Sequence, residues 1–268
     1  MKLKLWQVDA FARHALEGNP AAVVPLEAWI DAALMQKIAD ENNLAETAFF
    51  VRTGPGRYDL RWFTPEAEVD LCGHATLGSA WTIFEYLDPG LASVSFLTRS
   101  GELTVTRTAN GLSMSLPSDM PATYDAPAGL AKAIGEALDV PMPKELHKAR
   151  YLLALWDEAK VIRGIKRIDV GRVLRDAGFW GLVVTAKGDE GYDFVSRFFA
   201  PDKGVPEDPV TGSAHCILTP FWARRLGKKT LKARQVSPRG GDLVCTDDGA
   251  RTTLEGTCAP YMTGEISV

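Results

Sequence analysis

The alternation of apolar and polar residues predicts strands along most of the chain. Besides two or three strands between residues 94 and 115, the predicted strands are 3–11, 21–24, 46–51, 58–63, 151–156, 181–185, 193–199, 234–237, 242–246 and 251–256. Helical spacing of apolar residues predicts shorter helices at 31–40, 128–138 and 170–177. Asp31 suits the first of these as its N-cap, because its carboxylate can accept hydrogen bonds from free backbone N–H groups.

Two further segments, 73–86 and 212–226, are apolar on nearly every side. A helix with that pattern is buried, so each predicts a central helix surrounded by strands. Pro220 lies inside the second segment and is expected to bend or break the helix, because proline has no backbone N–H to donate.

The same succession of residues occurs twice. R-W-F-T-P at 61–65 returns as R-F-F-A-P at 197–201, and each copy leads through an acidic stretch into a turn of small residues. These turns are D-L-C-G-H-A-T at 70–76 and E-D-P-V-T-G-S-A-H at 207–215.

This repeat predicts an α+β fold of two similar lobes, with paired turns that can face one cleft. We expect the lobes to span 1–117 and 118–268, with the proline-rich segment 117–127 as the crossing. About the last ten residues can return to the first lobe.

Composition and charge narrow the function classes. The 268 residues are 46% hydrophobic and carry a net charge of −4, which does not suit a nucleic-acid-binding face. The N-terminus has no signal-peptide pattern, and no apolar run is long enough for a membrane span. The four cysteines are scattered, which favours free thiols in a cytoplasmic protein and gives no spacing for a metal site. We therefore expect no cofactor and no metal.

The two small-residue turns are the first candidates for a ligand site. A helix that begins at Gly73 or Gly212 leaves free backbone N–H groups at the positive end of its dipole, where a carboxylate binds well. The alternative is that both turns are tight caps, with small residues needed only for packing.

Glu46, His74 and Asp208 are the candidate acid–base groups. Glu46 follows a polar break and begins an apolar strand, and a carboxylate partly removed from water can transfer protons near neutral pH. His74 lies at a predicted helix N-terminus, and Asp208 precedes Pro209. Each has a structural alternative, respectively a strand-edge glutamate, a packed histidine and a turn cap.

Cys72 lies at the entrance of the first apolar helix, where the dipole can activate a thiol. The matching position in the second copy is Thr211, so a mechanism with one thiol on each face of the substrate lacks its second thiol.

These residues carry a resemblance to a known family. G-N-P-A-A-V at 18–23, N-L-A-E-T-A-F at 43–49, the two turn motifs and S-P-R-G-G at 237–241 resemble the PhzF-like family, in family order along almost the whole chain. The resemblance implies a diaminopimelate-epimerase-like fold: two lobes, each a β-barrel-like roll around a central helix. It also implies a homodimer.

By motif, the resemblance implies catalytic roles for Glu46, His74 and Asp208. The substrate-binding positions that go with these motifs are Asn19, Gly73, Thr76, Thr211, Gly212 and Ser213.

The resulting hypothesis is a cofactor-independent isomerase. It would move a proton within a small carboxylate-bearing substrate, with Glu46 as acid and base. The alternatives are a cysteine-type amino-acid racemase or epimerase, against which Thr211 argues, and a non-catalytic small-molecule binding or interaction protein.

Overall fold

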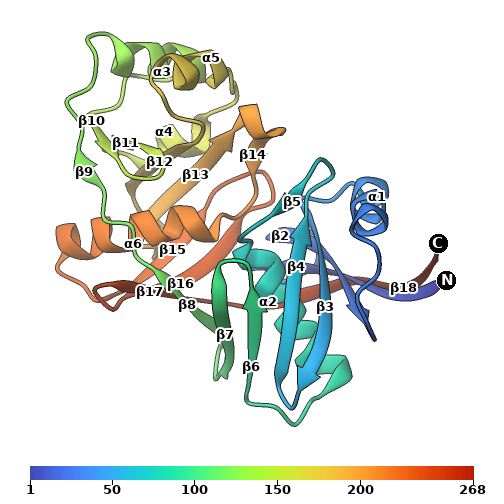
Figure 1. The fold of residues 1–268 in the computed structure, drawn as a ribbon. Coiled ribbons are helices and arrows are strands. Elements are labelled where there is room, and N and C mark those ends of the chain that lie inside the picture. Colours follow the sequence, from blue (N-terminus) through green and yellow to red (C-terminus); the bar gives the residue numbers. More distant parts are fainter. The chain divides into compact units, whose positions relative to one another are not determined.

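The structure, a computed structural model, describes residues 1–268 and divides into two compact units (Figure 1). Unit 1 comprises Met1–Leu116 and Leu254–Val268, and unit 2 comprises Pro117–Thr253. The returning segment of unit 1 is longer than the stretch of roughly ten residues expected from the sequence. It contains β18(Cys258–Ser267), which pairs along the whole of β1(Lys2–Ala10). It is longer because the end of the preceding strand, which pairs with β8(Gly111–Pro117) of unit 1, belongs to it as well.

Unit 1 is built mainly of strands, with one helix on each face of its sheet. Its elements after β1 are β2(Asn19–Leu26), α1(Ala32–Asn42), β3(Glu46–Gly54), β4(Arg57–Phe63), β5(Glu68–Val69), α2(Gly73–Thr82), the π-helical turn η1(Ile83–Leu87), β6(Ser93–Thr98), β7(Gly101–Thr108), β8(Gly111–Pro117) and β18.

Unit 2 has more helices around a sheet of similar size. Its elements are β9(Ala122–Thr123), α3(Leu130–Leu138), β10(Glu145–Lys148), β11(Leu152–Trp156), α4(Ala159–Gly164), α5(Gly171–Asp176), β12(Leu182–Lys187), β13(Phe194–Ala200), the 3-10 turn η2(Pro201–Lys203), β14(Val205–Asp208), α6(Gly212–Leu226), β15(Thr230–Gln235) and β16(Gly241–Asp247). The strand β17(Arg251–Gly256) runs across the unit boundary.

The two sheets have the same strand topology. In unit 1, β1 is antiparallel to β2, β2 parallel to β3, β3 antiparallel to β4, β4 parallel to β6, and β6 antiparallel to β7. In unit 2, the same sequence of orientations runs through β10, β11, β12, β13, β15 and β16. The short strands β5 and β14 pair with β4 and β13, so each repeated pentapeptide ends an equivalent central strand. The predicted α+β class with two similar lobes is confirmed.

Helices cover both faces of each sheet. In unit 1, α1 packs through Met35 and Ile38 against one face, while Gly78 of α2 lies against Val8 and Val23. In unit 2, α3, α4 and α5 share a core with alternate residues of the strands, among them Val195. Phe194, which directly precedes Val195 in the chain, points to the opposite face of the sheet and stacks on Trp222 of α6.

The central helix α2 is buried although it contains several hydroxyl groups. Thr76, Ser79 and Thr82 are fully buried, and their hydroxyls donate to the carbonyls of Cys72, Ala75 and Gly78 at 2.6, 2.7 and 2.9 Å. This bonding to the carbonyl four residues earlier satisfies the polar groups inside the helix itself. An apolar environment on all sides is therefore tolerated.

Pro220 was expected to bend or break α6, and a break is wrong, because α6 runs unbroken from Gly212 to Leu226. Proline leaves the carbonyl of Cys216 without its helical donor. The backbone N–H of Asp119 donates to that carbonyl at 3.0 Å, so the group is satisfied from outside the helix. This replacement bond removes most of the reason for a break.

Most predicted strands and helices are confirmed, and the differences concern short or exposed elements. The sequence did not predict β5, β9, β10, α4, β14 or β18. It also placed β15 at 234–237, whereas the strand begins at Thr230 and ends at Gln235. The burial pattern of β18 explains one failure: seven of its ten residues are exposed, so the strand has no apolar alternation.

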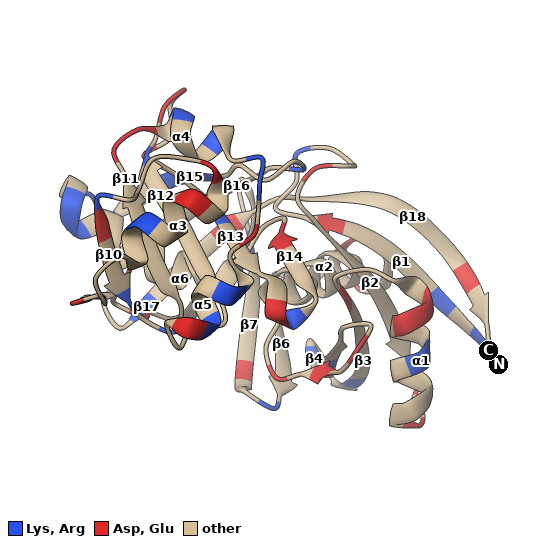
Figure 2. Ribbon diagram, turned by 90° about the horizontal axis from the view of Figure 1, so that it is seen from above, with Lys and Arg blue, Asp and Glu red and all other residues tan.

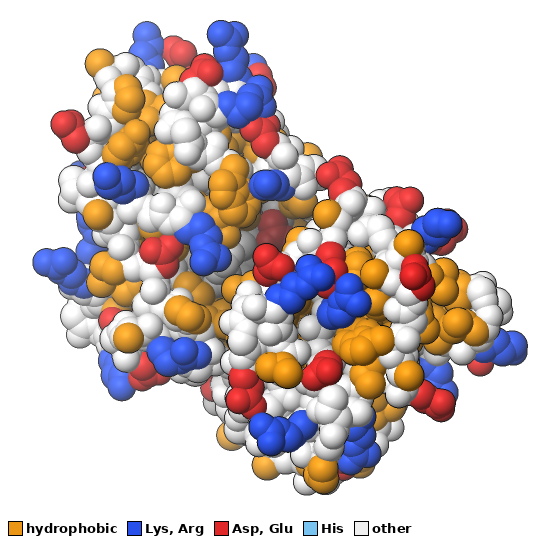
Figure 3. All heavy atoms as spheres, in the orientation of Figure 1, with side chains coloured by type: hydrophobic (Ala, Val, Ile, Leu, Met, Phe, Trp, Pro, Cys, Tyr) orange, Lys and Arg blue, Asp and Glu red, His pale blue; other side chains and the backbone are white.

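Charges of both signs are distributed over the surface. Lys and Arg alternate with Asp and Glu along the ribbon (Figure 2), and no continuous basic stripe crosses the face shown in Figure 3. None of the helices combines the length and the apolar character needed to cross a bilayer.

Candidate active site

Unit 1 brings three of the predicted site residues together. Asn19 begins β2 and Glu46 begins β3, and these strands pair in parallel, so both residues lie at the same edge of the sheet. Asn43 ends α1 in a left-handed conformation, with φ of 48°, and turns the chain into β3. His74 lies in the first turn of α2, directly after the N-cap residue Cys72 and Gly73. We call Asn19, Glu46, Cys72 and His74 the first half-site.

His74 is at the centre of the first half-site. Its Nε2 lies 3.0 Å from Oε2 of Glu46, and its Nδ1 lies 3.2 Å from Nδ2 of Asn19. The sulfur of Cys72 lies 3.5 Å from Nδ1 and 3.9 Å from Nε2. The His74 side chain is 7% exposed, while the Glu46 side chain keeps 18% of its surface, so the carboxylate is the group that a ligand can reach.

The electrostatics of the half-site favour a charged histidine and a neutral thiol. Burial opposes the imidazolium, but the Cys72 sulfur and the Glu46 carboxylate beside the ring outweigh it, and the pKa of His74 rises well above its usual range. Burial, helped by the nearby Glu46 carboxylate, raises the pKa of Cys72 to about 11. The thiol is therefore protonated at neutral pH, which does not suit a cysteine base.

Unit 2 assembles the other predicted residues around the start of α6. Asp208 ends β14 and accepts a hydrogen bond from the hydroxyl of Thr211, the N-cap residue of α6. Ser213, in the first turn of α6, has its hydroxyl 2.9 Å from the hydroxyl of Tyr151. We call Tyr151, Asp208, Thr211, Ser213 and Gln235 the second half-site.

Gln235 holds this turn in place and was missed by the sequence analysis. Its side chain is fully buried, and its Oε1 accepts from the backbone N–H of Thr211 at 2.9 Å. Its Nε2 donates to the backbone carbonyl of Asp208 at 2.7 Å and to the Thr211 hydroxyl at 3.2 Å. A glutamine inside the predicted strand 234–237 gives no sequence signal for this role, and neither does Tyr151, which comes from a strand-rich segment.

Neither central helix is capped by a side chain. Cys72 and Thr211 both have extended backbone conformations, and neither side chain accepts a hydrogen bond from its helix. The first-turn N–H groups after Gly73 and Gly212 therefore keep their capacity to bind an anion. Thr76, in contrast, is fully buried, and its hydroxyl donates to the backbone carbonyl of Cys72. Its hydroxyl is therefore engaged in a hydrogen bond within the helix.

The repeated arginine makes the same contacts in both units. Arg61 binds both oxygens of Glu68, at 2.7 and 2.8 Å, and Arg197 binds both oxygens of Glu207, at 2.6 and 2.7 Å. Each guanidinium also lies over the ring of the phenylalanine two residues later in its strand, Phe63 or Phe199, at 5.2 and 5.3 Å from the ring centroid. These ion pairs fix the strand that leads into each small-residue turn.

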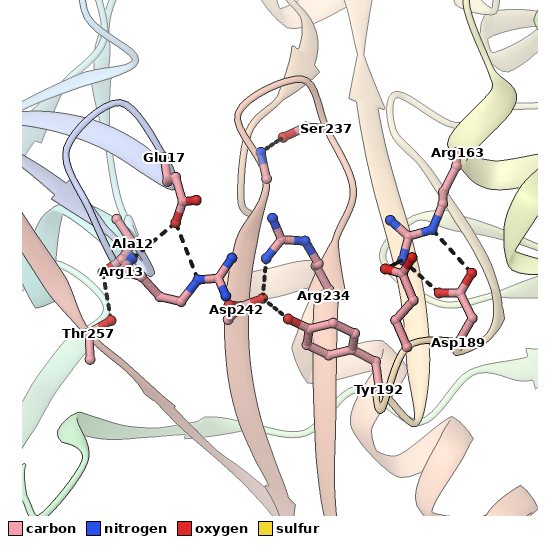
Figure 4. A network of polar contacts seen from close by, with 12 residues as sticks. Ala12, Arg13, Glu17, Arg163, Asp189, Tyr192, Arg234, Ser237, Asp242 and Thr257 are labelled. Carbon is pink, nitrogen blue, oxygen red and sulfur yellow. Dashed lines mark hydrogen bonds and ion pairs between the residues drawn. The ribbon is translucent and has the colours of Figure 1, made fainter.

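The S-P-R-G-G segment is a structured turn beside the second half-site. The hydroxyl of Ser237 donates to the carbonyl of Pro209 at 2.8 Å and accepts from the N–H of Gly240 at 3.1 Å. Gly240 has a positive φ of 65°, and a side chain there would collide with the guanidinium of Arg234. Figure 4 shows how Arg234 and Tyr192 both bind Asp242, the first at 2.5 Å and the second at 2.8 Å.

Comparison with known proteins is informative for this arrangement. A family model for phenazine biosynthesis-like proteins, PhzC-PhzF, matches residues 8–264. The chain belongs to the PhzF-like family. This agrees with the resemblance of the turn motifs.

Three relatives illustrate the range of similarity. An uncharacterized isomerase of Pseudomonas aeruginosa is 47% identical over 266 residues, which is 99% of each chain. The crystal structure of a PhzF family protein of Enterococcus faecalis superposes with a TM-score of 0.93 at 40% identity and covers 100% of both chains. A hydroxyproline epimerase of Agrobacterium vitis shares the fold, with a TM-score of 0.64 at 10% identity over 99% of this chain and 91% of its own.

Family membership and the isomerase name of the P. aeruginosa relative support an isomerase role for this chain. They also confirm the expected epimerase-like fold.

Proposed function

We propose that the protein is a cofactor-independent isomerase in which Glu46 moves a proton within a small carboxylate-bearing substrate. Glu46 would remove a C–H proton beside an unsaturated or enolisable carbon. It would then return the proton to another carbon on the same face of the molecule. Such a reaction needs one carboxylate that changes its charge state during turnover and no redox partner.

The pairing of Glu46 with His74 is the observation that supports this proposal most directly. At 3.0 Å from Nε2, the Glu46 carboxylate lies beside a histidine whose pKa is raised, and the proposed reaction begins with Glu46 as the base. Its partial exposure leaves it accessible to a substrate.

The remaining predicted residues are proposed to bind and orient the substrate. The first-turn N–H groups of α2 and α6 are suited to a carboxylate and to the negative charge that develops during proton abstraction. We assign Asp208 and Ser213 to polar groups of the substrate. Gln235 acts on them indirectly, by fixing the turn on which Asp208 and Thr211 lie.

Two other functions are less well supported. A cysteine-type racemase needs a thiol on each side of its substrate, but Thr211 occupies the second position and the Cys72 thiol is neutral at pH 7. A binding protein without turnover would keep the uncapped helices, but it would have no use for the buried Glu46–His74 pair.

Proton exchange in heavy water tests these three possibilities together. A panel of small unsaturated and α-amino carboxylic acids would be incubated with the protein in D2O and followed by NMR and chiral chromatography. The proposal requires deuterium incorporation into at least one acid without racemisation at a single centre. Exchange with racemisation would establish the racemase, and absence of exchange from every acid bound by the protein would establish the binding protein.

As a macromolecular partner we propose only a second copy of the chain. Sedimentation equilibrium would give a mass of twice 29.2 kDa for that homodimer and would contradict it with the monomer mass.

A further inference from the structure

The first half-site contains a set of metal-ligand atoms that the proton transfer does not require together. The Sγ of Cys72, a ring nitrogen of His74 and a carboxylate oxygen of Glu46 all lie within 4.8 Å of one another. They come from the N-cap and first turn of α2 and from the first residue of β3, so regular elements hold all three. Ligands on such elements are positioned more precisely than ligands on loops.

The Glu46 carboxylate provides a second, independent observation. Its Oε2 is buried and accepts no hydrogen bond, although it lies only 3.0 Å from Nε2 of His74. The two atoms are therefore at ion-pair distance without the alignment of a hydrogen bond. Without a metal, this oxygen therefore has the ion pair with His74 but no hydrogen bond, and a bound cation would supply a direct coordination bond in its place.

We propose that Cys72, His74 and Glu46 form a zinc site that inhibits the protein. In a tetrahedral zinc site with bonds of about 2.3 Å to sulfur and about 2.0–2.2 Å to nitrogen and oxygen, sulfur and nitrogen lie about 3.5 Å apart and nitrogen and oxygen about 3.4 Å apart. Here the Sγ–Nε2 distance is 3.9 Å and the Nε2–Oε2 distance is 3.0 Å. The sulfur lies nearly as far from Nδ1 (3.5 Å) as from Nε2 (3.9 Å), so the Cys72 side chain has to rotate toward the Nε2 side of the ring before the three atoms reach tetrahedral spacing.

The ligand types favour zinc over the harder cations. Thiolate and imidazole are ligands for zinc, whereas magnesium and calcium prefer sites made of oxygen atoms. Three protein ligands leave a fourth position for water, as in other zinc sites that are open to small molecules. When zinc binds, the Cys72 thiol forms a sulfur–zinc bond and loses its proton, and the His74 imidazolium loses the proton on Nε2, so two protons are released to the buffer.

Asn19 is suited to orient the histidine for the metal. Its side-chain amide is 3.2 Å from Nδ1 of His74. Rotation of the amide by half a turn presents Oδ1 to an Nδ1–H group, which places the lone pair on Nε2, facing Glu46 and the metal. Histidine ligands of zinc usually donate their other N–H to such a partner.

Zinc at this position would be an inhibitor because it occupies the groups that the proposed reaction uses. Glu46 cannot accept a substrate proton while it coordinates a cation. Formation of the site itself does not rest on the proposed function, since it needs only the three side chains and not a substrate.

Cobalt(II), a coloured substitute for zinc, gives a test that does not depend on activity. After treatment with a chelator, the full chain would be titrated with Co2+ and then with Zn2+. We expect one Co2+ per chain, with a sulfur-to-cobalt charge-transfer band and the strong visible bands of tetrahedral cobalt, both displaced by one equivalent of Zn2+. A wild-type protein that binds Co2+ without the charge-transfer band, or not at all, would overturn the proposal.

Three variants identify the ligands. Cys72→Ser should abolish the charge-transfer band and weaken zinc binding by at least about a hundredfold, more than the loss of a supporting residue usually costs. Glu46→Gln should keep the band and weaken binding. Cys245→Ser, which removes a buried thiol of β16 that is not in the cluster, should leave the spectrum unchanged.

The outcomes are separable from those of the proposed isomerase. Retention of the band in Cys72→Ser, with a melting curve like that of the wild type, would show that another thiol binds the metal and would refute the site. A protein that catalyses deuterium exchange but shows no cobalt–thiolate band would refute the zinc site alone. A band in a protein without exchange would leave the zinc site standing without the isomerase.

Discussion

His74 and His215 are both buried near the start of a central helix, yet their surroundings shift their pKa values in opposite directions. The pKa of His74 is raised because Cys72 and Glu46 lie beside it. Burial without a neighbouring charge lowers the pKa of His215 to about 4. Its Nδ1 donates to the carbonyl of Thr211 at 2.8 Å, and its Nε2 is buried without a partner.

This contrast distinguishes the arrangement of strands and helices that the two units share from the site side chains that differ between them. Both units keep the strand order, the paired arginine and the uncapped helix. Only the first half-site places a carboxylate, an imidazole and a thiol in contact, while the second uses hydroxyls, an amide and Asp208. Duplication therefore accounts for the scaffold, and the side chains of each copy account for its role.

The largest effect should come from removing the charge of Glu46. Glu46→Gln cannot shuttle a proton, so the rate of exchange should fall by roughly two to four orders of magnitude, the usual contribution of acid–base catalysis. Glu46→Asp should recover little, because moving the carboxylate by about an ångström costs on the order of a hundredfold. The measurements are initial rates of deuterium exchange, with thermal melts as a check on folding.

Carboxylate binding should survive in the Gln variant, because the helix N–H groups remain. A well-folded Glu46→Gln protein that exchanges deuterium at the wild-type rate would show that Glu46 is only a strand-edge residue. That result would refute both its proposed role and the mechanism.

The two repeated arginines give a matched comparison of stability. Arg197 is 5% exposed and also donates to the carbonyl of Ile165, so Arg197→Met would leave the Glu207 carboxylate buried and unpaired. The free energy of unfolding should fall by about 3–5 kcal/mol. Arg61→Met should cost only about 1 kcal/mol, because Arg61 is more exposed and Arg99 still binds Glu68 at 2.7 Å.

Urea denaturation of the two methionine variants at neutral pH would measure this difference. Equal losses would mean that the equivalent ion pairs are equally buried in solution, contrary to the structure.

The buried His215 should make the protein sensitive to mild acid. Its pKa is about 4 in the folded protein and about 6.5 when unfolded, so only the unfolded chain gains the proton between these values. Stability is therefore complete above pH 6.5 and falls as the pH drops toward 4, by about 3 kcal/mol from this residue alone. His215→Asn keeps a donor for Thr211 and does not titrate, so its loss of stability over the same range should be smaller.

The matched control is His14→Asn, which changes an exposed histidine. The test compares urea unfolding of the three proteins at several pH values. A His215→Asn protein that follows the acid dependence of the wild type would show that this histidine is not buried in its neutral form.

The sequence could predict the repeated elements because their signals are local. The R-x-F-x-P pentapeptides and the two apolar helices mark equivalent strands and helices. The N-L-A-E-T-A-F segment and the two turn motifs predict Glu46, His74 and Asp208 as candidate site residues. The roles of Gln235 and Tyr151 could not be predicted, since each depends on a partner that is distant in the chain, such as Thr211 or Ser213. The same applies to β18, which is defined only by its pairing with β1.

The smallest effect on exchange is expected for Cys72→Ser. The pKa of the thiol is raised to about 11, so at pH 7 the wild-type side chain is as neutral as the serine that replaces it. Proton transfer assigned to Glu46 should therefore keep its rate within a few-fold, whereas a cysteine base would lose several orders of magnitude, because a serine hydroxyl does not ionise in this range. The comparison requires rates measured with metal chelated, so that any zinc held by the wild-type thiol does not lower its activity. Near-complete inactivation of a well-folded Cys72→Ser protein under those conditions would transfer the role of base from Glu46 to Cys72. The protein would then be better described as a racemase in which Thr211 occupies the position of the second thiol.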